Sequence, residues 1–379
     1  MNTTTTTPPL QMVDLRTQYH RFKAEIDQQI LDCIESTAYI NGPAVKTFQA
    51  GLEAYLGVKH VIPCANGTDA LQIAMMALDL KPGDEVIVPA FTYVATAEVI
   101  GLLGLHPVMV DVLPDTFNID VAQIEAAITP RTKAIVPVHL FGQCADMEAL
   151  LALAERHGLY VIEDNAQAIG ADYTFSDGRV AKSGTMGHFG CTSFFPSKNL
   201  GCYGDGGALF TNDDALAAKA RLIANHGQSR QYYHDAIGIN SRLDSLQAVV
   251  LNVKLPHLDA FNATRRAAAD FYDRAFAAHP HLITPARAHN STHVFHQYTL
   301  RLSNGRRDAL KATLAEQGIP AMIYYPVPLY KQLAYQPYWK GGELPVTEML
   351  CQEVFSLPMH SELNESTLER ITTAVLAAE

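Results

Sequence analysis

Short apolar runs alternate with amphipathic stretches through the first half of the chain. Apolar runs of strand length occupy residues 60–64, 85–90, 107–112, 133–142 and 159–167. Between them, apolar residues recur at helical spacing over 66–78, 92–104, 120–128 and 147–157. Strands that are apolar on both faces and separated by helices are typical of a parallel sheet covered by helices on both sides. We therefore predict an α/β domain that binds its ligand beyond the carboxyl ends of the strands.

The pattern changes after about residue 215. Helical spacing covers 213–227 and the long stretch 243–279, and the rest is mixed, with strands predicted at 294–302 and 321–327 and helices at 306–318 and 366–379. We place a domain boundary near residue 260, inside the long helix. Residues 1–260 would then form the large α/β domain with its N-terminal segment, and residues 261–379 a smaller α+β domain.

Composition and charge limit the functions that such a fold can have. The chain has 379 residues, 48% of them apolar, and its 28 basic and 39 acidic side chains give a net charge of −11. An acidic surface repels a phosphate backbone, which argues against a general nucleic-acid-binding protein but not against a small phosphorylated ligand in a local pocket. Six widely spaced cysteines without a C-x-x-C pair favour free thiols in a reducing compartment.

The N-terminus and the apolar segments bear on location. Residues 1–15 lack the basic and apolar regions of a signal peptide, and we expect them to be a short frayed leader. No segment has the uninterrupted apolar length of a membrane span. We expect a cytoplasmic protein that binds neither membranes nor nucleic acids.

Lys198 lies between an apolar stretch and a glycine-rich turn, in CTSFFPSKNLGCYGDGGALFT. Glycines let the backbone approach a ligand closely, and a lysine in such a pocket can lose its proton and form a Schiff base with a carbonyl group. The alternative is a surface lysine beside a hairpin. Asp164 ends the apolar run LYVIED, where it could pair with the protonated pyridine nitrogen of pyridoxal phosphate or cap a helix. Its neighbour Glu163 would point to the other face of the strand and is the weaker candidate.

Other residues could contact the same ligand. The small-residue turn at 66–69 opens a helix and could offer backbone N–H groups to a phosphate, or it could be a plain helix cap formed by the threonine or the aspartate. Tyr93 follows an apolar run and could stack on a planar cofactor, or be a buried aromatic at a helix start. No G-x-G-x-x-G follows a strand, which disfavours an NAD-dependent oxidoreductase. We expect no metal site, because His293 and His296 of the cluster with His289 would face opposite sides of a strand.

A phosphate turn, an aromatic residue, an acid and a lysine thus follow one another at the ends of predicted strands. From MVDL to FSLPMH, almost its whole length, the sequence resembles the DegT/StrS sugar aminotransferases, which are pyridoxal-phosphate enzymes of fold type I. The resemblance is carried by the blocks ANGTDAL, PAFTYVATA, EDNAQAIGA, SFFPSKNLGCYGDGGALFTND and GINSRLDSLQA. It implies an aspartate-aminotransferase-like large domain with a mostly parallel sheet of the seven-stranded type, bound pyridoxal 5'-phosphate, and a homodimer with shared active sites.

The resemblance also implies roles for single residues. Lys198 would be the Schiff-base lysine, Asp164 the partner of the pyridine nitrogen, and Gln167 a contact of the cofactor's hydroxyl group. The remaining cofactor contacts that it implies are Gly67, Thr68 and Ser193 at the phosphate, Tyr93 on the ring, and Asn240 from the neighbouring subunit. Family members that remove a sugar hydroxyl have histidine in place of the lysine. Lys198 therefore favours transamination, with glutamate as the expected amino donor.

The expected substrate is a keto nucleotide sugar. The strings CANGTDALQIA, ITPRTKAIVPV, FGQCAD and HGQSRQYYH look most like those of family members that act on UDP-2-acetamido-2-deoxy-3-oxo-glucuronate, in amino-sugar biosynthesis of the O-antigen type. Arg230 is a candidate clamp for the uronate carboxylate, because a guanidinium group binds carboxylates bidentately, or else a solvated arginine at a helix end. Tyr324 and Tyr325 would lie near the substrate, and Tyr324 stands where many members have histidine. A 4-keto nucleotide sugar is the alternative substrate, and a sensor that binds cofactor or sugar without turnover is the alternative function.

Overall fold

The structure is a computed structural model that describes residues 10–379. Its larger sheet has seven strands in the order β1-β9-β8-β5-β4-β2-β3. The bounds are β1 (His60–Cys64), β2 (Glu85–Pro89), β3 (His106–Val110), β4 (Thr132–Ile135), β5 (Tyr160–Asp164), β8 (Phe189–Ser193) and β9 (Gly207–Thr211). The pairs from β8 to β3 are parallel, whereas β9 is antiparallel to both of its neighbours. The predicted α/β fold with a mostly parallel sheet is confirmed.

Helices cover both faces of this sheet. Val86 and Val88 of β2 belong to the core on one face, whereas Ile87, between them, belongs to the core on the other. The first face is covered by α3 (Gly67–Ala77), α4 (Ala95–Leu102) and α7 (Asp214–Ala224), and the second by α5 (Val121–Ala127) and α6 (Met147–His157). Successive side chains of a strand point to opposite faces, so a short strand must be apolar throughout when both faces are covered.

Three helices pack together near the β1 edge of the sheet: α1 (Leu15–Ser36), α2 (Pro43–Leu56) and α8 (Ser245–Lys254). Phe48 of α2 and Phe210 of β9 share one apolar cluster there. The ring of Phe48 also meets that of Phe194 edge-on, with the centroids 5.2 Å apart. Phe194 directly follows β8, so α2 supports the start of the loop that contains Lys198.

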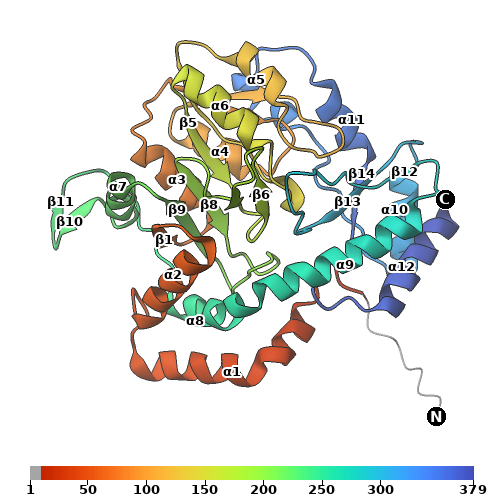
Figure 1. The fold of residues 1–379 in the computed structure, drawn as a ribbon, viewed down its shortest axis with the longest axis horizontal. Coiled ribbons are helices and arrows are strands. Elements are labelled where there is room, and N and C mark those ends of the chain that lie inside the picture. Colours follow the sequence, from red (N-terminus) through yellow and green to blue (C-terminus); the bar gives the residue numbers. More distant parts are fainter. Residues whose placement is uncertain (1–9) are drawn as a thin grey trace.

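The C-terminal part of the chain forms a second, smaller sheet beside the first, and the long helix α9 runs towards it (Figure 1). Its strands are antiparallel, in the order β12 (Leu282–Ile283), β13 (Tyr298–Leu302) and β14 (Val354–Leu357). The helices of this part are α9 (Leu258–Phe276), α10 (Arg307–Glu316), α11 (Pro345–Glu353) and α12 (Glu365–Ala378). The division of the chain at residue 260, close to the start of α9, stays a prediction.

Short elements complete the fold. Two hairpins are formed by β6 (Asp172–Thr174) with β7 (Val180–Lys182) and by β10 (Gln228–Arg230) with β11 (Tyr233–His234). Single 3-10 turns are η1 (Leu140–Gly142), η2 (Leu255–His257), η3 (Leu329–Lys331) and η4 (Gln336–Tyr338). In Figure 1 the β10–β11 hairpin projects from the side of the molecule, beyond α7.

The structure corrects two predicted elements near prolines. The helix predicted over 243–279 is two helices separated by η2, where Pro256 has no N–H group to continue the helical hydrogen bonds. The strand predicted over 133–142 ends at Ile135, just before Pro137, and continues into η1. At both places a proline lacks the backbone N–H group that a regular helix or strand would use as a hydrogen-bond donor.

Two predicted strands of the C-terminal part also differ from the structure, one in extent and one in existence. The strand over 294–302 begins only at Tyr298, because the preceding backbone groups have other partners: the N–H group of Val294 donates to the carbonyl of Gly142, and Arg265 donates to the carbonyls of the residues before Gln297. No strand forms over 321–327, where only Met322 bridges to another strand.

Most of the predicted leader lies outside the described residues, and Leu15 already begins α1. All six cysteines are free and buried, which confirms the prediction of free thiols. Within residues 10–379, no helix has the length and apolar character that crossing a membrane requires.

Candidate active site

Asp164 and Lys198 lie at the carboxyl ends of two neighbouring parallel strands of the large sheet. Asp164 is the last residue of β5 and lies opposite Cys191 of β8. Lys198 follows β8, in the loop that turns back into β9, and its backbone N–H group donates to the carbonyl of Phe195 over 2.8 Å. The carboxyl ends of β5 and β8 thus present an acid and an amine side by side, where open α/β sheets bind their ligands.

The carboxyl group of Asp164 is held in place by two hydrogen bonds and is almost out of contact with water. Thr96 donates its hydroxyl to Oδ2 over 2.8 Å, and the N–H group of Ala166 donates to Oδ1 over 3.1 Å. The residue is 6% exposed. Burial raises the pKa of this carboxyl group, against the opposing effects of its two donors and of Lys198. No helix follows Asp164, so the alternative that it is a helix cap is wrong.

Lys198 is half-buried, with its amino group in desolvated surroundings. Burial lowers the pKa of this amine to about 8, although the charge of Asp164 acts in the opposite direction. A lysine with such a pKa is partly neutral near neutral pH, so it can act as a nucleophile and as a base. Partial burial beside Asp164 distinguishes Lys198 from an exposed surface lysine.

The register of the sheet sets the predicted phosphate turn beside Ser193. Gly207 of β9 lies opposite Cys64 at the end of β1 on one side and opposite Ser193 at the end of β8 on the other. The turn that follows β1 therefore meets the end of β8. The approach is so close that a Cβ atom added to Gly67 would lie 2.8 Å from the Cβ atom of Ser193.

The N-terminus of α3 opens towards this point. Asn66 is its cap and accepts the N–H group of Asp69 over 2.8 Å, so the alternative that Thr68 or Asp69 caps the helix is wrong. The first N–H groups of a helix have no partner within it and carry the positive end of its dipole. Gly67 and Thr68, both half-buried, are the first residues of α3, where such a helix end suits an anion.

Gln167 and three tyrosines lie together in another part of the site. The Oε1 atom of Gln167 accepts the N–H group of Phe141 over 2.8 Å, and its Nε2 atom donates to the hydroxyl of Tyr325 over 3.2 Å. The rings of Tyr325 and Tyr93 lie 6.3 Å apart, and Tyr324 is 6.0 Å from Tyr325. Tyr93 is 57% exposed, so the alternative of a buried aromatic is wrong and its ring is free to cover a ligand.

This set of groups fits the predicted pyridoxal phosphate. A partly neutral amine suits the aldehyde, and a buried carboxylate suits a protonated ring nitrogen. A helix N-terminus beside a serine suits a phosphate. Across residues 10–379, no cluster of three or more histidine, cysteine, aspartate or glutamate side chains is placed to hold a metal ion.

Two predicted residues, Arg230 and Asn240, take no part in the contacts described above. Arg230 lies on β10 with its guanidinium group 3.6 Å from the ring centroid of Tyr233, and both residues are exposed. Because it belongs to a hairpin, the alternative of an arginine at a helix end is wrong. Asn240 is exposed and pairs with Asn225 after α7.

Sequence reasoning missed Thr96 and His139. Thr96 stands three residues after Tyr93, in the block PAFTYVATA, but its contact with Asp164 depends on where the start of α4 lies relative to the end of β5. His139 contacts Glu163, and its backbone N–H group donates to the carbonyl of Asp164. The only signal for His139 is that it is a polar residue inside the apolar run 133–142, which is predicted to be a strand.

Comparison with known proteins places this site in context. The sequence profile of the DegT/DnrJ/EryC1/StrS aminotransferase family matches residues 20–376. A pleiotropic regulatory protein of Geobacillus stearothermophilus is 49% identical over 96% of this chain and 97% of its own. The UDP-2-acetamido-2-deoxy-3-oxo-D-glucuronate aminotransferase of Pseudomonas aeruginosa is 47% identical over 97% of this chain and 99% of its own. The crystal structure of a DegT DnrJ EryC1 StrS aminotransferase from Brucella abortus superimposes with a TM-score of 0.92 at 44% identity, covering 97% of this chain and 99% of that one.

Further relatives differ in the nucleotide that their names contain. A UDP-N-acetyl-3-dehydro-alpha-D-glucosamine 3-aminotransferase of Acidithiobacillus ferrooxidans is 45% identical, and a dTDP-3-amino-3,4,6-trideoxy-alpha-D-glucose transaminase of Streptomyces venezuelae is 40% identical. A GDP-perosamine synthase of Caulobacter vibrioides is 39% identical. All three alignments cover at least 91% of this chain and 93% of the relative. The structure of NtdA from Bacillus subtilis, solved with bound cofactor PMP, has a TM-score of 0.88 at 30% identity, covering 97% of this chain and 83% of that one.

The depressed pKa of Lys198 predicts unusual reactivity. In cofactor-free protein, we expect acylation of Lys198 by an amine-specific reagent to rise with a midpoint near the pKa of about 8, well below the ordinary lysine value of 10.5. The charge of Asp164 raises that pKa, so Asp164→Asn should move the midpoint to lower pH. Peptide mass spectrometry across a pH series measures both. The exposed Lys46 is the internal control, whose labelling Asp164→Asn should leave unchanged. A midpoint near 10.5, or an upward shift in the variant, would contradict this picture.

The close approach of Gly67 to Ser193 predicts a specific effect of a methyl group. In Gly67→Ala the new Cβ atom would force the helix start and β8 apart, and overpacking of this kind costs about 1–3 kcal/mol. We expect the dissociation constant for pyridoxal phosphate, measured by fluorescence titration, to rise roughly 10-fold or more. Gly342→Ala is the matched control, because no atom lies within 4 Å of its added Cβ. Equal affinities of the two variants would refute a phosphate site at this turn.

Proposed function

Because the chain belongs to the DegT/DnrJ/EryC1/StrS aminotransferase family, we propose that it transfers an amino group from glutamate to the 3-oxo position of UDP-2-acetamido-2-deoxy-3-oxo-glucuronate. The chain is a pyridoxal-phosphate-dependent sugar aminotransferase. The substrate is the proposed part. It is supported by the relatives named for UDP-linked 3-keto sugars, which are more similar to this chain than those named for dTDP- or GDP-linked sugars.

The pairing of an amine and an acid at the ends of β5 and β8 supports the transamination chemistry itself, whereas the sugar is proposed from the named relatives. When bound, pyridoxal phosphate supplies a carbonyl group that exchanges amino groups and a ring that takes up the electrons of a carbanion. The Nζ atom of Lys198, whose pKa burial lowers to about 8, can take a proton from the substrate carbon and return it. The carboxylate of Asp164 holds the proton on the ring nitrogen, and Thr96 fixes the orientation of that carboxylate.

The other assigned residues bind and orient. We assign the phosphate group to the N-terminus of α3 at Gly67 and Thr68 and to the hydroxyl of Ser193, which the sheet register brings together. We assign one face of the ring to Tyr93 and the ring hydroxyl to Gln167. Gln167 donates a hydrogen bond to the hydroxyl of Tyr325, so a group that binds Gln167 would also affect the position of this tyrosine.

The exposed residues Arg230 and Asn240 support a shared site in a homodimer. Both lie outside the contacts that join the other assigned residues, and β10 and β11 project from the body of the chain (Figure 1). We infer that this hairpin reaches the active site of a second copy, where Asn240 meets the phosphate group and Arg230 meets the uronate carboxylate. The six free, buried thiols support a reducing compartment, which we take to be the cytoplasm.

The substrate assignment predicts a clear order in a panel of sugars. With glutamate as donor, we expect turnover of UDP-2-acetamido-2-deoxy-3-oxo-glucuronate, freshly made from the parent uronate, with kcat/KM at least ~100-fold above that for dTDP- or GDP-linked 4-keto hexoses. Amino-sugar formation is measured by mass spectrometry. A preference for a 4-keto sugar would establish the alternative substrate, and the absence of turnover with conversion of the cofactor by glutamate intact would reject the whole panel.

The clamp assignment predicts a selective loss. Arg230→Ala should lower kcat/KM for the uronate roughly 10- to 100-fold, since a charge-assisted hydrogen bond contributes about 1.5–3 kcal/mol. The corresponding neutral 3-keto sugar should be affected little. Arg179→Ala is the matched control, because Arg179 is also exposed and stacks on a ring, at 3.8 Å from the centroid of Phe175. If Arg230→Ala affects both sugars equally, Arg230 is no carboxylate clamp.

A further inference from the structure

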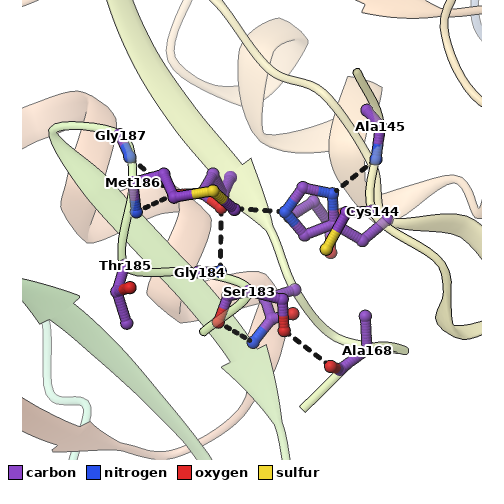
Figure 2. Close-up of polar contacts among 12 residues, drawn as sticks. Cys144, Ala145, Ala168, Ser183, Gly184, Thr185, Met186 and Gly187 are labelled. Carbon is purple, nitrogen blue, oxygen red and sulfur yellow. Dashed lines mark hydrogen bonds and ion pairs between the residues drawn. The ribbon is translucent and has the colours of Figure 1, made fainter. Parts of the chain in front are cut away.

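A buried polar cluster lies on the side of β5 opposite Asp164. Glu163 and His139 are both fully buried, with Nε2 of the histidine 2.8 Å from Oε2 of the glutamate. Three backbone N–H groups of the turn between β7 and β8 donate to the same carboxyl group, from Gly184 at 2.8 Å, Met186 at 2.6 Å and Gly187 at 2.5 Å. Figure 2 shows this turn on one side of the cluster and Ala145 on the other.

The hydrogen-bond directions fix the protonation of both side chains. The Nδ1 atom of His139 accepts the N–H group of Ala145 over 3.2 Å, so it carries no hydrogen. The hydrogen of the ring is then on Nε2 and points to Glu163. A carboxyl group that accepts four N–H groups has no site left for a proton of its own, so Glu163 is ionised. The cluster holds one negative charge whose burial is compensated by four donors.

The cluster is connected to two of the assigned cofactor contacts. The backbone N–H group of His139 donates to the carbonyl of Asp164 over 3.0 Å. Two residues further on, the N–H group of Phe141 donates to Oε1 of Gln167 over 2.8 Å and so fixes which way the amide of Gln167 faces. Displacing His139 would therefore move the end of β5 and turn Gln167 at the same time.

A second connection runs through the turn itself. Asn165, directly after Asp164, donates its amide to the carbonyl of Ser183 over 3.1 Å, and the hydroxyl of Ser183 donates to the carbonyl of Ala168 over 2.6 Å. Figure 2 shows Ser183 and Ala168 next to Gly184 in this network. The segment that contains Asp164 and Gln167 is thus tied on both sides to groups that Glu163 organises.

We propose that Glu163 and His139 are positioning residues of the aminotransferase, which hold the backbone at Asp164 and Phe141 so that the Asp164 carboxylate and the Gln167 amide meet bound pyridoxal phosphate. Both residues are fully buried on the side of β5 opposite Asp164, so neither would touch the cofactor. The proposal rests on the roles assigned above to Asp164 and Gln167. A misplacement of catalytic groups on the order of 1 Å can cost about 100-fold in rate, so an intact cluster is a condition for turnover.

The test is made on the holoenzyme with Glu163→Gln. The amide offers an NH2 group where the carboxylate accepted N–H groups, so the turn and β5 must shift apart. We expect kcat to fall about 100-fold with a much smaller change in KM for glutamate. We also expect the pH midpoint of the absorbance of bound pyridoxal phosphate to shift and its dissociation constant to rise, as they would for Asp164→Asn.

Two variants of His139 distinguish its contact with Glu163 from its contact with Ala145, and they provide the test if Glu163→Gln does not fold. The amide nitrogen of His139→Gln can replace Nε2 and still donate to Glu163. The shorter His139→Asn can accept from Ala145 at the position of Nδ1 but cannot reach Glu163. We expect His139→Gln to retain most of the wild-type absorbance profile and His139→Asn to follow Glu163→Gln. Equal profiles of the two histidine variants would overturn the proposal.

Glu353→Gln is the control for lost stability alone. Glu353, the last residue of α11, pairs with Arg301 of β13 at 2.8 Å, and neither residue is assigned to the cofactor or the sugar. The Glu353→Gln variant should have a lower Tm than the wild-type protein but the same cofactor absorbance and the same kcat. If Glu163→Gln lowers only the Tm, as this control does, the cluster is merely structural and the proposal is wrong. If Asp164→Asn itself leaves the absorbance profile unchanged, the role assigned to Asp164 fails first, which distinguishes the two failures.

Discussion

The site depends on a carboxylate placed where water can hardly reach it. A buried carboxylate must meet a cation, gain hydrogen bonds or take up a proton. Asp164 receives two hydrogen bonds, and burial still raises its pKa, while the pKa of Lys198 falls to about 8. Burial favours the uncharged form of both groups. A protonated ring nitrogen would stabilise the Asp164 carboxylate, and a neutral Lys198 would not repel it. The adjacency of β5 and β8 is what makes this pairing possible.

Consecutive residues of β5 solve the same electrostatic problem in opposite ways. Glu163 accepts four N–H groups and has no capacity left for a ligand, whereas Asp164 accepts only two donors on the other side of the strand. A fully satisfied buried charge makes the structure rigid, and a partly satisfied one can still bind. The alternation of the strand allows one residue to stabilise the scaffold and the next to do chemistry.

Most strands of the central sheet could be predicted because each is a short apolar run, and that pattern also placed Asp164 at a strand end and Lys198 beyond an apolar stretch. The strands β8 and β9 were not predicted, and Ser193 was assigned only through the family resemblance. Three features could not be read locally. The contact of Thr96 with Asp164 depends on how α4 packs, and that of His139 with Glu163 on which strands are neighbours. The late start of β13 depends on Arg265, whose guanidinium group takes up carbonyl groups of the preceding residues. The tyrosines at 324 and 325 resemble a strand in composition, but no ladder forms there.

The positions of these groups separate the chemistry from the choice of sugar. The amine, the acid and the phosphate turn stand at the ends of central strands and at the start of α3, which the core clusters hold from both sides. Arg230, proposed to meet the sugar, lies on an exposed hairpin, where a change disturbs little of the core. Relatives named for UDP-, dTDP- and GDP-linked sugars align over nearly the whole chain, as expected if one rigid cofactor site serves different sugars. A net charge of −11 is no obstacle to an anionic sugar, because the helix end and Arg230 would supply the positive field locally.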